Sequence, residues 1–277
     1  MEAIVDGVRK VAYQGEPGAF SESAAAKMEP GAQLLPCRTL SEAFKVVALG
    51  RADAAVVPVE NSLAGSIGET YDLLLTHNLV VTGEVILPVN HCLMALPGVS
   101  LSQIRKVVSH PQALAQCNDF LEQLAVECVP FYDTAGAARH VRETGATDTA
   151  AVASRHAADI YRLQVLIENI QSYRDNFTRF YRIERELRPA GIKNKSVFVV
   201  SLPHHPGSLF MALASFACRG INLTKIESRP VKKDPWQYVF FLEFEGHIND
   251  WAVKQAIDEL QAKSSMLKVL GSFSVEE

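Results

Sequence analysis

The turn from Gly15 to Ser21 is the first segment whose residue types could bind a substrate. It reads Gly-Glu-Pro-Gly-Ala-Phe-Ser and precedes an alanine-rich stretch typical of a helix. A glycine-containing turn before a helix points backbone N–H groups outward, and such groups suit an anionic ligand. We therefore consider Gly18, Ala19 and Phe20 candidate substrate-binding residues. An ordinary strand-to-helix turn is the alternative interpretation.

A second polar segment follows a buried strand that is predicted over residues 54–59. The strand runs into Glu60, Asn61 and Ser62, and Ser66 comes four residues later. In open α/β sheets, ligands bind beyond the carboxyl ends of the strands. Asn61, Ser62 and Ser66 could therefore donate hydrogen bonds to a carboxylate. Ser66 also begins the pattern Ser-Ile-Gly-Glu, which predicts a helix cap.

Ser109, His110 and Gln112 lie at the carboxyl end of another predicted strand, residues 106–109. His110 could act as a general acid or base, because imidazole titrates near neutral pH. Pro111 favours the first position of a helix, so His110 could instead cap or pack. All three residues are candidates for substrate binding.

The fourth segment is Asn176-Phe-Thr-Arg-Phe180. In a regular strand Thr178 and Arg179 point to opposite faces. A threonine hydroxyl can donate a hydrogen bond, and an arginine can pair with a substrate carboxylate. Phe180 is a further candidate for substrate contact. A threonine between two aromatic residues also fits an ordinary strand.

Strand and helix patterns alternate up to residue 184 and position these segments. Strands are predicted over residues 11–13, 54–59, 79–86, 106–109, 126–131 and 150–153, and helices from Ser21 or Ser23, from Thr39 and from Ser66, and over residues 111–124, 134–143 and 154–161. Repeated strand-helix units predict an α/β architecture with a largely parallel sheet. One five-stranded sheet needs fewer units, so we expect two lobes with a cleft between them.

The pattern changes after Glu184. A charged stretch containing Pro189 and Gly191 predicts a linker. The order of predicted elements behind it is βαββαβ, a ferredoxin-like unit, with its third strand expected over residues 236–246. We therefore expect a catalytic domain over residues 1–188, a linker over 189–195 and a second domain over 196–277.

Composition and motifs exclude several classes of protein. The 277 residues carry a net charge of −4, which leaves no electrostatic footprint for nucleic acid. No run approaches the ~20 apolar residues of a membrane span. The metal, nucleotide and nucleophile-elbow motifs are absent, so we expect no metal and no cofactor. Five cysteines without a CxxC pair indicate free thiols, and no signal peptide is evident. A cytoplasmic protein is expected, or one of an organelle stroma if a transit peptide was removed.

Taken together and in this order, the motifs resemble one family. YQGEPGAFSE, PVENSLAGSI, SHPQALAQC and NFTRF resemble prephenate dehydratases, including the plant relatives that act on arogenate. The tail PGSLFMALASFACRGINLTKIESRP resembles the regulatory ACT domain that is fused to those enzymes. The resemblance implies a two-lobed catalytic domain like the periplasmic binding proteins. It also implies cofactor-free decarboxylation and dehydration of prephenate to phenylpyruvate, or of arogenate to L-phenylalanine.

The resemblance assigns roles to single residues. It places the family's catalytic threonine on Thr178 and an adjoining arginine on Arg179. Thr178 is too weakly acidic to be an ordinary acid, so we expect it to stabilise the developing charge on the leaving hydroxyl. His110 is the rival acid. A solute-binding or sensor protein on the same two-lobed fold is the alternative from another functional class.

The ACT resemblance implies binding of L-phenylalanine where two such domains meet, and hence a dimer or tetramer. The loop before residue 208 opens a helix and could present N–H groups to a carboxylate. The predicted effector-site residues are Gly207, Ser208, Leu209, Asn222, Glu227, Ser228, Arg229 and Pro230. The family's second ACT motif commonly reads GALV, whereas this chain has Gly-Ser-Leu-Phe.

Overall fold

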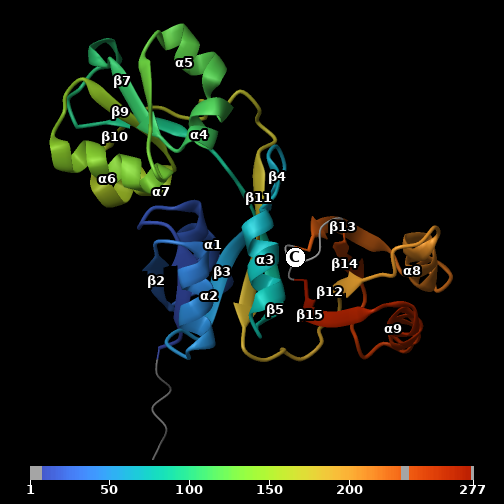
Figure 1. Cartoon of the computed structure of the whole chain (residues 1–277). Helices are drawn as coiled ribbons and strands as arrows, with labels where there is room; N and C mark the ends of the chain where they lie inside the picture. The colour runs from blue at the N-terminus through green and yellow to red at the C-terminus, as the bar shows by residue number, and fades with distance from the viewer. Residues whose placement is uncertain (1–7, 232–236, 276–277) are drawn as a thin grey trace, which may run out of the picture.

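The computed structural model describes residues 8–231 and 237–275. Two lobes and a third, C-terminal unit follow one another along the chain (Figure 1). The expected α/β class, the two lobes and the βαββαβ tail are all confirmed. Trp236, where one tail strand was predicted to begin, lies outside the described residues.

The first lobe contains a mixed five-stranded sheet in the order β5-β11-β3-β1-β2. Its strands are β1 (Lys10–Gln14), β2 (Gln33–Cys37), β3 (Ala54–Asn61), β5 (Val80–Pro88) and β11 (Phe177–Glu184), and the short β4 (Gly65–Ser66) pairs with β3. Its helices are α1 (Phe20–Met28), α2 (Leu40–Ala48) and α3 (Gly68–Thr76). Strand β11 returns from the second lobe and inserts antiparallel between β3 and β5.

Two helix starts in this lobe had been predicted from capping patterns. Thr39 accepts a hydrogen bond from the backbone N–H of Glu42 and caps α2 as expected. The prediction for Ser66 is wrong, because that residue lies in β4 and its hydroxyl donates to Glu227 at 2.7 Å. The residue before α3 is Ile67, which provides no side-chain cap.

The second lobe contains a five-stranded sheet in the order β10-β6-β9-β7-β8. Its elements are β6 (Cys92–Ala95), η1 (Leu101–Gln103), β7 (Lys106–Ser109), α4 (Pro111–Gln116), α5 (Asn118–Leu124), β8 (Glu127–Pro130), α6 (Thr134–Thr144), β9 (Thr149–Ala153), α7 (Arg155–Tyr161) and β10 (Gln164–Ile167). The helix predicted over residues 111–124 is broken at Cys117 into α4 and α5. Two crossover segments join the lobes, one before β6 and one before β11.

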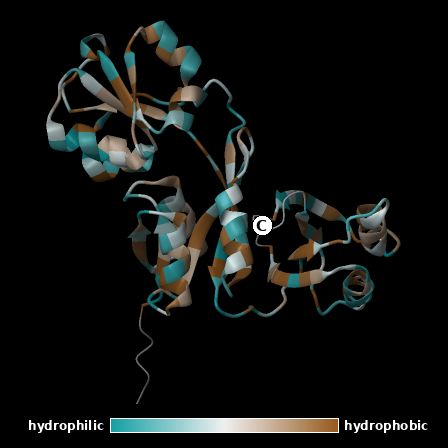
Figure 2. Cartoon of the chain, in the orientation of Figure 1, coloured by the Kyte–Doolittle hydropathy of each residue, from teal (hydrophilic) through white to brown (hydrophobic). Residues whose placement is uncertain are grey.

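The third unit has an antiparallel sheet in the order β13-β14-β12-β15, with its two helices on the face turned away from the lobes (Figure 1). Its elements are β12 (Asn194–Ser201), α8 (Ser208–Ala217), β13 (Leu223–Pro230), β14 (Tyr238–Glu245), α9 (Trp251–Lys263) and β15 (Met266–Ser274). Most strands of the molecule carry hydrophobic residues (Figure 2).

The third unit is joined to the first lobe by a shared core and a shared sheet. Tyr71 of α3 packs on Phe241 of β14 with ring centroids 4.9 Å apart. Strand β15 pairs with β5 at Gly271 and Val81. A Cβ atom on Gly271 would lie 2.3 Å from the carbonyl oxygen of Val81, so this close approach requires glycine.

Candidate active site

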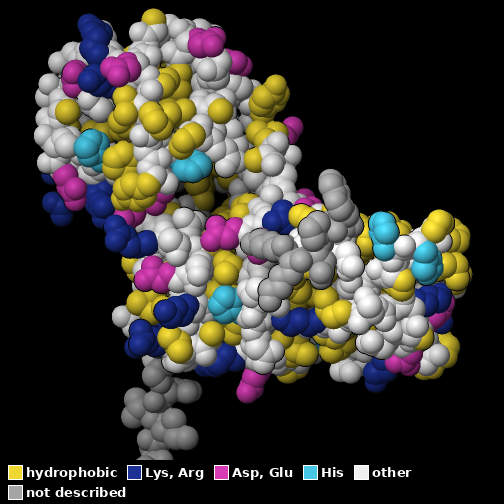
Figure 3. All heavy atoms as spheres, in the orientation of Figure 1, with side chains coloured by type: hydrophobic (Ala, Val, Ile, Leu, Met, Phe, Trp, Pro, Cys, Tyr) yellow, Lys and Arg dark blue, Asp and Glu magenta, His cyan; other side chains and the backbone are white. Residues whose placement is uncertain are grey.

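A cleft of two connected chambers lies between the lobes, where Figure 3 shows the surface hollowed. The inner chamber has a volume of about 170 Å³ and the outer chamber about 480 Å³. Seven residues border both chambers: Phe20, Ser21, Pro58, Ile67, His110, Gln112 and Thr134. Asn61, Thr178 and Phe180 line the inner chamber, and Ala19 lines the outer one.

Thr178 and Asn61 face each other across neighbouring strands. The register of β11 on β3 places Thr178 opposite Asn61. The Asn61 side-chain amide donates to Thr178 Oγ1 at 3.0 Å, and both residues are less than 10% exposed. Within the described part of the chain, the Thr178 hydroxyl makes no other hydrogen bond. Its own proton is therefore available to a molecule in the cleft.

The amino-terminal end of α1 supplies N–H groups to the same cleft. The Ala19 carbonyl accepts from the N–H groups of Glu22 and Ser23, and the cap has no side-chain hydrogen bond. The backbone N–H groups of Phe20 and Ser21 have no acceptor among the described residues. Such groups, at the positive end of a helix dipole, can bind a carboxylate.

His110 caps a helix and also lines the cleft. Its Nδ1 accepts from the backbone N–H of Gln112 at 3.2 Å and caps α4, and its side chain also borders both chambers. Gln112 borders the same two chambers. The capping interpretation is therefore confirmed, and access to a ligand is retained.

Arg179 lies on the opposite side of the sheet from the cleft. Its guanidinium is 2.7 Å from Glu243, 2.9 Å from Glu60 and 3.4 Å from Glu84. The expectation that Arg179 binds a substrate carboxylate does not fit this position, because three protein carboxylates already surround it. The alternation of β11, which directs Thr178 into the cleft, directs Arg179 toward the third unit.

Arg179 belongs to a partly buried interdomain charge cluster. Its members are Glu60, Glu84, Arg179, Lys195, Lys225 and Glu243. Burial would raise the pKa of Glu243, but Arg179, Thr224 and Tyr181 together hold it below its usual range. Burial and the neighbouring Glu243 raise the pKa of the Tyr181 phenol well above its usual range. Glu60 and Arg179 directly neighbour Asn61 and Thr178 in sequence, so the cluster contacts β3 and β11 on the side away from the cleft.

Four other predicted residues do not reach the cleft because their polar groups are used by the protein. The N–H of Gly18 donates to Glu22 at 2.6 Å, and the hydroxyl of Ser109 donates to the Val152 carbonyl at 2.6 Å. Ser62 bonds the crossover before β11, and Ser66 bonds Glu227. Each was placed near the site by sequence, but its side chain or N–H makes a hydrogen bond within the protein instead.

The sequence analysis missed several polar residues of the site. Gln116 and His91 line the inner chamber, and Asn176 bonds Asn61 from behind it. Gln116 follows Gln112 by four residues, a helical spacing that puts both on one face and could have revealed it. Asn176 begins the fourth segment of the sequence analysis, where no role was assigned to it, and His91 lies in a crossover segment where no periodicity marks it. Arg38, which lines the outer chamber, was also missed.

The predicted effector-site residues are divided between two faces of the third unit. A pocket of about 140 Å³ is lined by Ser208 and Leu209, next to Gly207 at the start of α8. Glu227 and Arg229 instead point toward the first lobe, where they bond Ser66 and Asp72. Within one chain these two side chains lie away from the α8 pocket, and their role in an effector site between two chains stays a prediction. Asn222 contributes its carbonyl to a backbone bond, and Ser228 and Pro230 are exposed on the edge strand β13.

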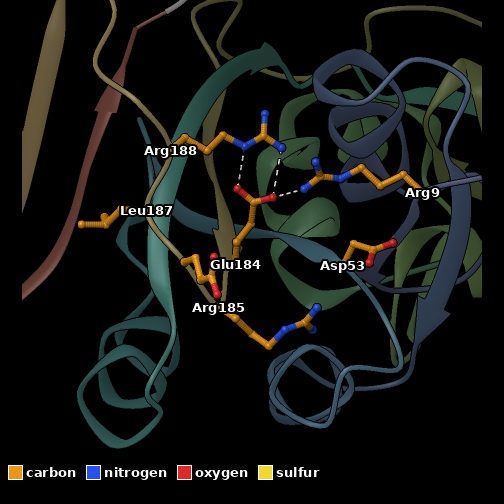
Figure 4. Close-up of a pocket in the computed structure, with 7 residues that line it drawn as sticks. Arg9, Asp53, Glu184, Arg185, Leu187 and Arg188 are labelled. Atoms are coloured by element: carbon orange, nitrogen blue, oxygen red, sulfur yellow. Dashed lines mark hydrogen bonds and ion pairs between the residues drawn. The ribbon is translucent and has the colours of Figure 1, made fainter. Parts of the chain in front are cut away.

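A wider groove of about 780 Å³ lies at the other end of β11 (Figure 4). Its arginines are already paired, since Arg9 and Arg188 bond Glu184. Arg185 donates to the carbonyls of Val47 and Ala52. With its charges satisfied and Thr178 at the far end of the strand, this groove is not the candidate active site.

Two further features concern ligands and membranes. Within residues 8–231 and 237–275, no group of three or more potential ligand side chains could hold a metal ion. In the same ranges, no helix has both the length and the apolar character needed to cross a bilayer.

Comparisons with known proteins agree with this geometry. The family model for prephenate dehydratase matches residues 11–188. A relative from Arabidopsis thaliana, named arogenate dehydratase/prephenate dehydratase 2, chloroplastic, is 46% identical over 287 residues, covering 99% of this chain and 75% of the relative.

Two solved structures are also similar over nearly the whole chain. Prephenate dehydratase from Arthrobacter aurescens in complex with L-Phe has a TM-score of 0.88 and 34% identity, covering 96% of this chain and 89% of that one. A structure described as GqqA, a novel type of quorum quenching acylases, has a TM-score of 0.90 and 35% identity, covering 97% and 98%.

Proposed function

Because this chain belongs to the prephenate dehydratase family, we propose that its cleft converts prephenate or arogenate into an aromatic product. The ring carboxylate leaves as CO₂, and its electron pair enters the ring. The ring hydroxyl leaves with a proton as water. Prephenate gives phenylpyruvate, and arogenate gives L-phenylalanine.

The observation that carries this proposal is the hydrogen bond from Asn61 to Thr178. Because Thr178 Oγ1 accepts from Asn61, its proton can point to the hydroxyl that leaves the ring. A donor aimed at developing negative charge stabilises the transition state more than the ground state. The inner chamber around Thr178 contains Pro58, Ile67 and Phe180, which exclude water and strengthen that interaction.

The substrate carries two carboxylates, and the cleft offers donors for them. The free N–H groups of Phe20 and Ser21 take one carboxylate at the amino-terminal end of α1. Arg38 provides a positive charge in the outer chamber, and no ion pair holds it within the described residues. These groups replace Arg179 in the role that was expected from the sequence.

The similarity to an acylase suggests a second chemistry, which the cleft does not support. An acylase of the hydroxyl type needs a nucleophile that is activated by an adjacent base. Among the described residues that line the cleft, no serine or threonine hydroxyl donates to a histidine or a carboxylate, and the partner of Thr178 is an amide. The Tyr132 phenol donates to Glu16 at 3.0 Å, but burial and this carboxylate raise its pKa to about 12, which makes it a poor nucleophile. An amide cannot accept the proton of a nucleophile, so we favour the dehydratase.

Regulation by L-phenylalanine is part of the proposal. The pocket beside α8 offers the N–H groups at the start of a ten-residue helix to the amino acid's carboxylate. A second copy of the chain completes the site, which makes the form that binds the effector at least a dimer. The similar enzyme from Arthrobacter aurescens was solved with L-Phe, which supports this effector.

The interdomain charge cluster gives the effector a physical route to the cleft. Lys225 of β13 bonds Glu60 at 2.6 Å, and Glu243 of β14 bonds Arg179 at 2.7 Å. A shift of the third unit's sheet would therefore move the chain neighbours of Asn61 and Thr178. The ligand inhibits if it binds better to an arrangement in which these strands are displaced.

The cellular location remains a prediction. The Arabidopsis relatives named chloroplastic support an organelle stroma over the cytoplasm. Fractionation of cells that express the chain from its own gene would distinguish the two.

Turnover by the purified full chain tests the proposed reaction. Prephenate and arogenate should be supplied separately, and the products identified by chromatography as phenylpyruvate and L-phenylalanine. We expect at least one of them to form with release of CO₂. A chain that binds both compounds but converts neither would identify a sensor instead.

A further inference from the structure

His91 is the buried titratable residue of the cleft that the reaction described above does not use. It lies in the crossover before β6 and is 2% exposed. Its ring packs edge-on against Phe20, with centroids 5.8 Å apart. Nε2 lies 2.9 Å from Gln116 Oε1, and Nδ1 has no hydrogen-bond partner among the described residues. In a neutral imidazole only one of the two nitrogens carries a proton, and the hydrogen bond at Nε2 indicates which one.

A chain of side-chain amides connects His91 to Thr178. Asn176 Nδ2 donates to Gln116 Oε1 at 3.1 Å, and Asn61 Nδ2 donates to Asn176 Oδ1 at 2.7 Å. The same Asn61 nitrogen then donates to Thr178 Oγ1 at 3.0 Å. The order along the chain is His91, Gln116, Asn176, Asn61 and Thr178.

The direction of this chain is fixed at one end by the backbone. Asn61 Oδ1 accepts from the N–H groups of Leu63 at 3.1 Å and Ala64 at 3.0 Å. The nitrogen of Asn61 must therefore face Asn176, whose oxygen accepts and whose nitrogen donates onward to Gln116. Gln116 Oε1 is therefore an acceptor, and it lies 2.9 Å from His91 Nε2. The imidazole proton belongs on Nε2, because two acceptors would repel each other at this distance. Burial lowers the pKa of His91, which leaves Nδ1 as a bare lone pair.

The opposite tautomer would create a conflict that ends at Thr178. An unprotonated Nε2 would face the Gln116 oxygen, and a flip of Gln116 would oppose its nitrogen to that of Asn176. A flip of Asn176 would move the same clash to Asn61, beside the catalytic hydroxyl. A buried network that is only partly satisfied is costly, so the tautomer of His91 matters for every bond in the chain.

We propose that His91, neutral and protonated on Nε2, is a positioning residue that keeps the Thr178 hydroxyl directed at the substrate. This inference rests on the proposed function of Thr178. His91 acts through Gln116, Asn176 and Asn61, which come from both lobes and a crossover segment. The relative position of the two lobes and the orientation of the hydroxyl are thus coupled, because Gln116 belongs to the second lobe and Asn61 to the first.

Matched substitutions separate the donor from the bulk of the ring. His91→Gln places a side-chain nitrogen near the position of Nε2, whereas His91→Leu removes the donor. Leu should lower kcat about tenfold, the scale of one lost hydrogen bond, with KM changed less than threefold because His91 does not touch the charged groups. Gln should recover kcat to within about threefold of the native chain. A Leu variant that is folded and retains full kcat would overturn the proposal.

The tautomer can be measured without any substrate. In the native full chain, labelled with ¹⁵N-histidine, the His91 imidazole should show a protonated Nε2 and an unprotonated Nδ1 at neutral pH. The signal is assigned to His91 by its loss in His91→Gln. A proton on Nδ1, or on both nitrogens, would overturn the proposal even if the enzyme is active. Absence of turnover on prephenate and arogenate would instead refute the proposed function and leave this measurement interpretable.

Discussion

Removing the charge of Glu243 tests whether the third unit is fixed on the catalytic lobe as the structure shows. The Glu243 side chain is 2% exposed and accepts from Arg179 at 2.7 Å and from Thr224 at 2.6 Å. Tyr181 also donates to it. In Glu243→Gln the new amide N–H₂ group would face these donors. The interdomain charge cluster would keep three cations against two carboxylates.

The expected cost follows from this burial. Removing one partner of a buried ion pair typically destabilises a protein by about 3–5 kcal/mol. If the free energy of unfolding falls by ~3 kcal/mol per M of urea, the urea concentration at the unfolding midpoint should fall by about 1 M or more. Glu245→Gln is the matched control, since this residue is exposed two positions along β14. Its effect should stay within about 0.5 kcal/mol.

The pH dependence provides an independent check with a definite sign. The folded-state pKa of Glu243 is lowered, mainly through Arg179 once burial is overcome. Its contribution is therefore fully present above the unfolded-state pKa and is lost as the pH falls through the folded-state pKa. The stability gap between the native chain and Glu243→Gln should narrow in acid. If the two Gln variants unfold at the same urea concentration at neutral pH, the docked arrangement is refuted.

Three further predictions concern the cleft and its control. Arg38→Ala should raise KM for either substrate about tenfold with little change in kcat. The control Arg51→Ala, on the exposed surface of the same lobe, should change neither KM nor kcat. If Arg38→Ala has the KM of the native chain, Arg38 does not bind the substrate. L-Phenylalanine should lower activity, and substrate should weaken its binding in calorimetry by the same factor, whereas an effector that binds without this reciprocity would contradict the linkage. A chain ending at Arg188 should lose stability, because it exposes Tyr71 and leaves Arg179 without Glu243; an equal urea midpoint would show that the shared core is unimportant.

The fold was predictable from sequence because its signals are local. Alternating strand and helix patterns gave the α/β class and the βαββαβ tail. Strands such as β2 and β6 were missed because they are only five and four residues long, although Pro30-Gly31 precedes the first and Pro97-Gly98 follows the second. The position of β11 between β3 and β5 depends on a chain return through the second lobe, which no local pattern encodes.

Site residues were predictable from the sequence where the geometry of a strand restricts the direction of the side chain. Alternation correctly separated Thr178 from Arg179, but the sequence did not reveal which face met the cleft. Arg179 was assigned to the substrate because its partner Glu243 lies 64 residues away in another unit. Ser109 carries a hydroxyl at the carboxyl end of β7, where a substrate-binding residue was expected. That hydroxyl instead donates to the Val152 carbonyl of the neighbouring strand β9. His91 could not be found, because its role depends on partners from both lobes.

Turnover by Thr178→Val and Thr178→Ser tests the central claim most directly. Val keeps the branched shape and removes the hydroxyl, whereas Ser keeps the hydroxyl that Asn61 bonds. Both variants should unfold at nearly the native urea concentration. We predict that Val lowers kcat by ~10² or more and that Ser retains most of the native rate. A folded Val variant with native kcat on prephenate or arogenate would contradict the account.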